Sequence, residues 1–224
     1  MIRMRLLIKS LFIAGASALA AAPVASAESE YWEQRASLFD ILPVNSGDIV
    51  FLGNSITDGG EFAELFGMSN IKNRGISADV VKGVEKRLDR VIENQPKKIF
   101  LLIGINDVSH NLSADRIASD YARIVKRIRK EAPRSELYIQ SVMPVNNDFK
   151  RYKNLLGKER VITELNGKLR TLAESTGAHY VDLWPALADP ATGKLRREFT
   201  NDGLHLTGKG YKAWTAAIDG LVRE

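Results

Sequence analysis

The chain has 224 residues, 32 basic and 27 acidic side chains, a formal net charge of +5 and no cysteine. The absence of thiols excludes disulfides, cysteine nucleophiles and sulfur-ligated metal sites. No run of lysine or arginine is longer than two residues, so the modest positive charge does not indicate a nucleic-acid partner.

Residues 1–27 have the layout of a secretory signal peptide. They begin with basic residues, continue with an apolar stretch over 11–22 and end in Ala25-Ser26-Ala27. The apolar stretch is too short to span a bilayer comfortably, although an uncleaved anchor is the alternative. We therefore expect export to the periplasm or beyond, no stable membrane insertion after cleavage, and one domain formed by residues 28–224.

Short apolar runs alternate with amphipathic segments along the rest of the chain. The predicted strands are Asp48–Leu52, Asn70–Asn73, Lys98–Ile103, Glu136–Val142 and His179–Trp184. The predicted helices cover Tyr31–Leu42 and the apolar stripes within 80–91, 117–128 (with Ser113 as N-cap), 161–172 and 211–221. This strict alternation predicts an α/β fold with a parallel sheet and helices on both faces.

Polar, glycine-containing clusters follow the predicted strands. They are "GNSITDGG" after the first strand, "NRGIS" after the second, "GINDVSHN" after the third and "NDGLHLTGKG" before the last helix. Ligand sites in parallel sheets form at the carboxyl ends of the strands, so these clusters should meet at one edge.

Together the four clusters resemble those of the SGNH (GDSL-type) hydrolase superfamily. The matching residues are Ser55 in "GNSIT", Gly75 in "NRGIS", Asn106 in "GIND", and His205 in "DGLHL", with Asp202 three residues before the histidine. The resemblance implies a flavodoxin-like three-layer sandwich with five parallel strands in the order 2-1-3-4-5. "GNSIT" departs from the "GDS(L)" form and is more similar to the exported bacterial acetylesterase- and acetylhydrolase-like branch.

These residues suit ester hydrolysis through an acyl-serine intermediate. His205 would take the proton of Ser55 and return it to the leaving alcohol, while Asp202 orients the imidazole; Asp182 is the rival acid. The backbone N–H groups of Ser55 and Gly75 and the side-chain amide of Asn106 would form the oxyanion hole. Neither a metal nor an organic cofactor is expected.

The substrate is predicted from the loops around these residues. They are mainly polar, which favours a short acyl group, most simply acetyl, on a carbohydrate or other polar alcohol. Asn146 is a candidate substrate contact, and His110 either contacts substrate or faces solvent. Asp107 is expected to brace its loop and His179 to be structural.

Three other functions remain open. A lysophospholipase or thioesterase acting on longer acyl chains is the first alternative. A flavin- or phosphate-binding module would use the Ser/Thr/Gly loop but leave Asp202 and His205 without a role. An α/β-hydrolase would need G-x-S-x-G, whereas position 57 is threonine. The oligomeric state is left open.

Overall fold

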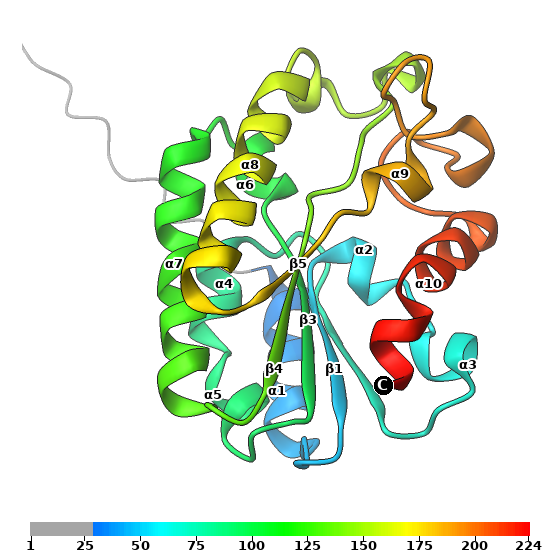
Figure 1. Ribbon diagram of the computed structural model, residues 1–224. Coiled ribbons are helices and arrows are strands. Elements are labelled where there is room, and N and C mark those ends of the chain that lie inside the picture. Colours follow the sequence, from blue (N-terminus) through cyan, green and yellow to red (C-terminus); the bar gives the residue numbers. More distant parts are fainter. Residues whose placement is uncertain (1–28) are drawn as a thin grey trace, which may run out of the picture.

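The computed structural model describes residues 29–224, so the predicted signal peptide lies outside the described residues (Figure 1). Five parallel strands form one sheet in the order β2-β1-β3-β4-β5. They are β1 (Ile49–Gly53), β2 (Ile71–Gly75), β3 (Lys98–Leu102), β4 (Glu136–Gln140) and β5 (His179–Val181). The predicted fold class and strand order are confirmed.

Helices cover both faces of the sheet (Figure 1). They are α1 (Glu30–Ile41), α2 (Ser55–Asp58), α3 (Phe62–Phe66), α4 (Val81–Lys86), α5 (Asp89–Ile92), α6 (Ile105–Ser109), α7 (Ala114–Glu131), α8 (Glu159–Thr176), α9 (Trp184–Leu187) and α10 (Gly208–Arg223). Short 3-10 turns occur at Asn147–Phe149, Lys153–Leu155 and Arg197–Phe199. Helices α4, α7 and α8 lie on one face, and α3 and α10 on the other (Figure 1). No helix within residues 29–224 has the length and apolar character needed to cross a membrane.

The two central strands, β1 and β3, are buried along their whole length. Their continuous apolar sequences fit this position, because both faces of a parallel sheet are covered by helices. Phe51 of β1 stacks on Phe62 of α3 and on Phe100 of β3, with ring centroids 4.0 and 5.0 Å apart. The core thus fixes the strand that leads into Ser55.

Several element boundaries differ from those predicted. The apolar stripe within 80–91 is divided between α4 and α5, because the chain leaves the helix at Arg87, whose side chain turns inward. Strand β5 ends at Val181 because Asp182 caps the next turn: its Oδ1 accepts the N–H of Trp184, 3.1 Å away. Ser113 is the N-cap of α7, as predicted, since its Oγ accepts the N–H of Arg116.

The C-terminal end of α10 lies at the amino edge of the sheet. Lys98, the first residue of β3, donates from Nζ to the carbonyl of Leu221 over 2.6 Å. Lys97 likewise donates to the carbonyl of Glu224 over 3.0 Å. Ser55 follows the carboxyl end of β1, so the C-terminus and Ser55 are at opposite edges.

Candidate active site

Ser55 is the first residue of α2, immediately after β1. Asn54 caps this short helix by accepting the N–H of Ile56 at its side-chain oxygen, 3.1 Å away. Gly53 before it has no room for a side chain, because an added Cβ would lie 2.2 Å from the carbonyl oxygen of Leu102 on β3. The tight exit from the sheet therefore presents Ser55 at the carboxyl edge.

Three side chains form a continuous hydrogen-bond chain at this edge. Ser55 Oγ lies 2.9 Å from His205 Nε2, and His205 Nδ1 lies 2.8 Å from Asp202 Oδ2. The other carboxylate oxygen of Asp202 accepts the N–H groups of Leu204 and His205, which fixes the turn between acid and histidine. Burial alone would raise the pKa of Asp202, but hydrogen bonds from His205 and from these N–H groups lower it to about 2. Asp202 is therefore an ionised acceptor at neutral pH.

The rival acid, Asp182, lies elsewhere. Its Oδ2 pairs with Arg170 over 3.2 Å, and its Oδ1 caps the turn at Trp184. Both partners of this ion pair are largely exposed. Of the two acids, the structure brings only Asp202 to His205.

Tyr152 joins this hydrogen-bond chain, although no sequence pattern predicts its role. Its hydroxyl oxygen is 2.9 Å from Asp202 Oδ2 and 2.9 Å from His205 Nδ1. The ring packs edge-on against the imidazole, with centroids 5.6 Å apart. Burial, assisted by the hydrogen bond to Asp202, raises the pKa of Tyr152 to about 12, so the hydroxyl stays a donor. Asp202 thus receives hydrogen bonds from His205 and Tyr152 together.

Asn106 supplies a side-chain amide to the cavity that Ser55 lines. It lies on α6, which Gly104 starts with a φ of 122°, a conformation that favours glycine. One amide hydrogen is directed to the carbonyl oxygen of Asp79, 2.8 Å away. An amide carries two hydrogens, so the second is free for an oxygen bound beside Ser55.

The expectation for Gly75 needs correction. Its N–H donates to the side-chain oxygen of Asn73 over 2.7 Å, so it is not available to an oxyanion. Glycine is required there for another reason: an added Cβ would lie 2.1 Å from the backbone nitrogen of Asp58 on α2. Gly75 lets β2 end directly against the helix of the serine.

Ala78 occupies the place expected of Gly75. It lines the cavity beside Ser55 and has a φ of 64°, uncommon for a residue with a side chain. Within residues 29–224, neither its backbone N–H nor that of Ser55 has a hydrogen-bond partner. These two N–H groups and the Asn106 amide are therefore candidate donors for an oxyanion.

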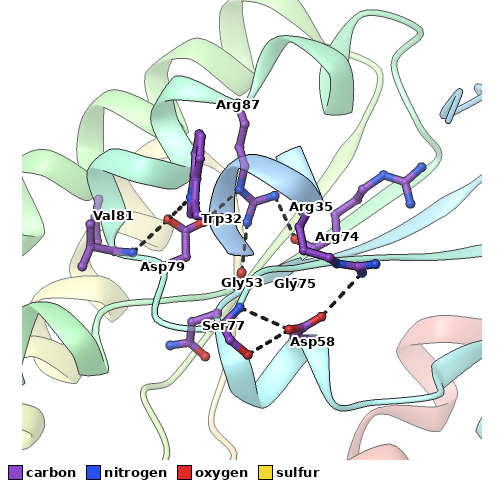
Figure 2. Close-up of polar contacts among 12 residues, drawn as sticks. Trp32, Arg35, Gly53, Asp58, Arg74, Gly75, Ser77, Asp79, Val81 and Arg87 are labelled. Carbon is purple, nitrogen blue, oxygen red and sulfur yellow. Dashed lines mark hydrogen bonds and ion pairs between the residues drawn. The ribbon is translucent and has the colours of Figure 1, made fainter. Parts of the chain in front are cut away.

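A buried ion pair supports this wall of the cavity (Figure 2). Arg87 Nη2 lies 2.8 Å from Asp79 Oδ2, and the guanidinium also donates to the carbonyl oxygens of Gly53 and Arg74, at the ends of β1 and β2. Trp32 Nε1 donates to Asp79 Oδ1 over 3.0 Å. Burial raises the pKa of Asp79 and lowers that of Arg87, which reflects the cost of desolvating both charges. Since the carbonyl of Asp79 accepts from Asn106, the pair fixes the residue that holds the amide.

Helix α1 makes a second contact to the site through Asp58, the last residue of α2. Asp58 Oδ2 accepts the hydroxyl of Tyr31 at 2.7 Å, and also the N–H and hydroxyl of Ser77. Arg35 lies 3.5 Å from the other carboxylate oxygen (Figure 2). Helix α1 thus contacts two of the three segments that carry the donors, the one after β1 and the one after β2.

Two adjoining cavities open at the site. The first, of about 580 Å³, contains Ser55, His205, Asn106 and Tyr152 and is completed by Ser77, Ala78, Ser109, Arg151, Lys153, Asn154, Leu155 and Leu204. The second, of about 440 Å³, shares Ser77, Ala78 and Asn106 with the first. It extends to Ser29 and Trp32 of α1 and to Lys82 on α4.

The weaker predictions for this region have mixed outcomes. His110 lines the second cavity and not the first. Asn146 lines neither: it is buried, and its amide donates to the carbonyl of Leu195 over 2.8 Å, so its expected role as a substrate contact is corrected to a structural one. The carboxylate of Asp107 accepts the N–H of Val81, which agrees with bracing of the loop. Burial raises the pKa of Asp107 to about 7.

No group of histidine, aspartate and glutamate side chains suited to a metal ion occurs within residues 29–224. The chain from Ser55 through His205 to Asp202 can instead move a proton between an alcohol oxygen and an imidazole. This is the arrangement used in acyl transfer by serine hydrolases.

Comparisons with known proteins agree with this chemistry. The model of the GDSL-like Lipase/Acylhydrolase family matches residues 51–213. A Streptococcus pneumoniae protein provisionally described as a platelet activating factor has 28% identity and a TM-score of 0.78, covering 87% of this chain and 92% of that one. A GDSL-like lipase from Bacteroides thetaiotaomicron has 22% identity and a TM-score of 0.74, covering 86% and 97%.

Two further relatives carry substrate names. A variant of Axe2, an acetyl-xylooligosaccharide esterase from Geobacillus stearothermophilus, has 19% identity and a TM-score of 0.62, covering 78% of this chain and 94% of that one. An N-acylneuraminate cytidylyltransferase of Escherichia coli is 28% identical over 185 residues, which are 79% of this chain. The match covers only 40% of that curated relative's length. Through the family match, the chain belongs to the GDSL-like Lipase/Acylhydrolase family.

Proposed function

We propose that the protein removes short acyl groups, acetyl in the first instance, from a carbohydrate or another polar alcohol, with Ser55 as nucleophile. The observation that carries the proposal is the hydrogen-bond chain from Ser55 Oγ through His205 to Asp202.

In the acylation step, His205 Nε2 takes the proton of Ser55 as Oγ attacks the ester carbon. The charge that develops on the carbonyl oxygen is stabilised by the second amide hydrogen of Asn106 and by the N–H groups of Ser55 and Ala78. His205 then protonates the departing alcohol oxygen, the acyl–oxygen bond breaks, and an acyl-serine remains. Asp202 stays ionised throughout and holds the imidazolium.

Deacylation repeats these steps with water. His205 takes a proton from the water, whose oxygen attacks the acyl carbon, and returns that proton to Ser55 Oγ as the acid departs. Free carboxylic acid and alcohol are the products, and no cofactor takes part in either step.

A short acyl group is supported by the composition of the first cavity. Apart from Tyr152, its apolar lining consists of Ala78, Leu155 and Leu204, and the remaining residues are polar or charged. A long acyl chain gains about 0.8 kcal/mol for each buried methylene only where apolar surface receives it. The structural likeness to an acetyl-xylooligosaccharide esterase points the same way. Lysophospholipid or thioester substrates are the competing class.

Two experiments test the proposal. A serine-reactive phosphonate should label wild type at Ser55, and Ser55→Ala should lose labelling together with about 10⁶-fold in turnover. Ser109→Ala is the matched control: Ser109 lines the same cavity, but its hydroxyl is directed to the carbonyl of Asn106. Labelling of any other residue would end the mechanism.

The acyl preference is tested with acetyl, butyryl, octanoyl and palmitoyl esters of one alcohol. We expect the highest kcat/KM for the acetyl ester. A maximum at octanoyl or beyond would replace the proposal with the long-chain alternative. Export of the protein remains part of the proposal and is tested by N-terminal sequencing of the mature chain, expected to begin at Glu28.

A further inference from the structure

The charged side chains around the two cavities are unbalanced. Arg151 and Lys153 line the first cavity, and Lys82 and Lys86 line the second. No acidic residue lines the first cavity, and Asp79, the acid of the second, is buried and paired with Arg87. The side chains that line the first cavity therefore include two cations and no acid.

Arg151 is also unusual among the arginines of the protein. Most of the others are engaged: Arg123 with Glu85 and Asp120, Arg170 with Asp182, Arg223 with Asp219. Within residues 29–224, Arg151 and Lys153 have neither an ion-pair partner nor a hydrogen-bond acceptor for their side chains. The N–H groups of an unpaired guanidinium remain available to bind a planar oxyanion such as a carboxylate.

The reaction fixes which part of the substrate lies beside these two cations. The leaving oxygen must lie next to His205 Nε2, because it takes its proton there. Tyr152 contacts His205, and Arg151 and Lys153 are its neighbours in sequence in the same cavity wall. Asn106 and Ala78 line the same cavity and, in the proposed mechanism, bind the acyl oxygen. The alcohol portion of the ester therefore runs along residues 151–154.

We propose that this alcohol carries an anionic oxygen group, a carboxylate or a phosphate, that binds Arg151 and Lys153. The inference rests on the proposed esterase function and adds a substrate class to it: an acyl ester of an acidic polar alcohol. Both side chains are exposed, so each contact is weak, and the two together give about a tenfold preference.

The test compares three acetyl esters at the same hydroxyl of one sugar ring: a neutral hexoside, the corresponding uronic acid, and the hexoside phosphate. Acetate release is measured at low salt (about 0.01 M) and at high salt (about 1 M), between which the screening length falls from about 30 to about 3 Å. We expect kcat/KM at low salt to be about tenfold higher for one or both anionic esters than for the neutral one. High salt should remove most of the difference. The two anionic substrates distinguish a carboxylate from a phosphate ligand.

Arg151→Gln combined with Lys153→Gln should abolish the ratio between anionic and neutral esters. The matched control combines Arg160→Gln with Lys212→Gln, which removes the same charge at exposed positions outside both cavities and should keep the ratio. Lys82→Gln, in the other cavity, should also keep it.

Three results would overturn the inference. Equal kcat/KM for neutral and anionic esters would mean that the protein is an esterase but does not prefer anionic alcohols. A ratio that disappears with Lys82→Gln but survives loss of Arg151 and Lys153 would place the anion on the acyl side. Failure of all three acetyl esters, with activity only on long-chain esters, would remove the proposed function itself and the inference with it.

Discussion

The two walls of the first cavity are built in opposite ways. The wall with Asn106 and Ala78 rests on the buried pair of Asp79 and Arg87, whose side chains are 1% and 6% exposed. The wall with Tyr152 belongs to the segment between β4 and α8, where Arg151 and Lys153 are exposed. Donors for a developing charge must be fixed before the reaction, whereas contacts to a variable alcohol tolerate mobile side chains. The fixed donors of the first wall suit stabilisation of the transition state, and the exposed side chains of Arg151 and Lys153 on the second wall suit contacts to the alcohol.

Among the residues that support Ser55, the acid that orients His205 should have the largest effect on rate. Asp202→Asn should lower kcat about 10⁴-fold, because the imidazole loses its orienting acceptor. Asp182→Asn is the control and should keep kcat, since its exposed pair with Arg170 contributes at most about 1 kcal/mol to stability. Steady-state kinetics on one acetyl ester checks both. If Asp182→Asn lowered kcat and Asp202→Asn did not, Asp202 would not be the acid that orients His205.

The buried pair should be important mainly for stability. Arg87→Met leaves the Asp79 carboxylate buried without its partner and should lower the free energy of unfolding by about 3–5 kcal/mol. Arg90→Met, which removes exposed ion pairs to Asp40 and Glu93, is the matched control. Urea denaturation measures both. Equal, small losses would mean that the first wall does not depend on this pair.

Removal of the Asn106 amide tests whether the first wall contributes to kcat. Asn106→Ala should lower kcat about 10²–10³-fold with a modest change in KM, because the amide is used mostly in the transition state. Asn154→Ala, an amide in the same cavity on the second wall, should act mainly on KM. A loss confined to KM in Asn106→Ala would make this residue a substrate contact.

Asp107 gives the first wall a pH dependence. Its native pKa of about 7 lies above the ordinary value of 3.8, so on raising the pH the unfolded state loses this proton before the native state does. The contribution to stability is therefore complete below about pH 4 and is lost as the pH rises to about 7. In Asp107→Asn, the free energy of unfolding should decrease less over this pH range, by at least about 1 kcal/mol, as measured by urea denaturation. Parallel pH curves for wild type and variant would contradict the raised pKa.

Tyr152 should give the smallest effect. Tyr152→Phe keeps the ring against His205 but removes a donor to Asp202, and we expect kcat to fall about tenfold with KM nearly unchanged, typical of one lost hydrogen bond to a charged group. Tyr180→Phe, another tyrosine with a raised pKa but outside both cavities, is the control. A change in KM alone would assign Tyr152 to substrate binding rather than to positioning the acid.

The features that could be predicted from the sequence are those that depend on local residue pattern and on the order of elements along the chain. Continuous apolar runs identified β1 and β3, and Ser113 marked the start of α7. The polar clusters after the strands identified the edge where Ser55, Asn106, Asp202 and His205 meet.

The rest depends on contacts that have no sequence pattern. Tyr152 lies in a polar loop with no periodicity, and only the folded chain brings it to Asp202, 50 residues away. Gly75 is predicted as an oxyanion donor from the family resemblance, but sequence does not tell which of several peptide N–H groups faces a cavity. Asn146 is predicted as a substrate contact, whereas its amide donates to a buried carbonyl.

Helix α1 precedes the residues matched by the family model, yet its first residues reach the site. Ser29 lines the second cavity, which adjoins that of Ser55, so a fusion partner or affinity tag joined directly ahead of it would begin beside the entrance to this cavity. The end of α10 lies beside Lys97 at the opposite edge of the sheet. Immobilising the enzyme through its C-terminus should therefore leave the entrance open, whereas attachment at Ser29 should obstruct large substrates before small ones.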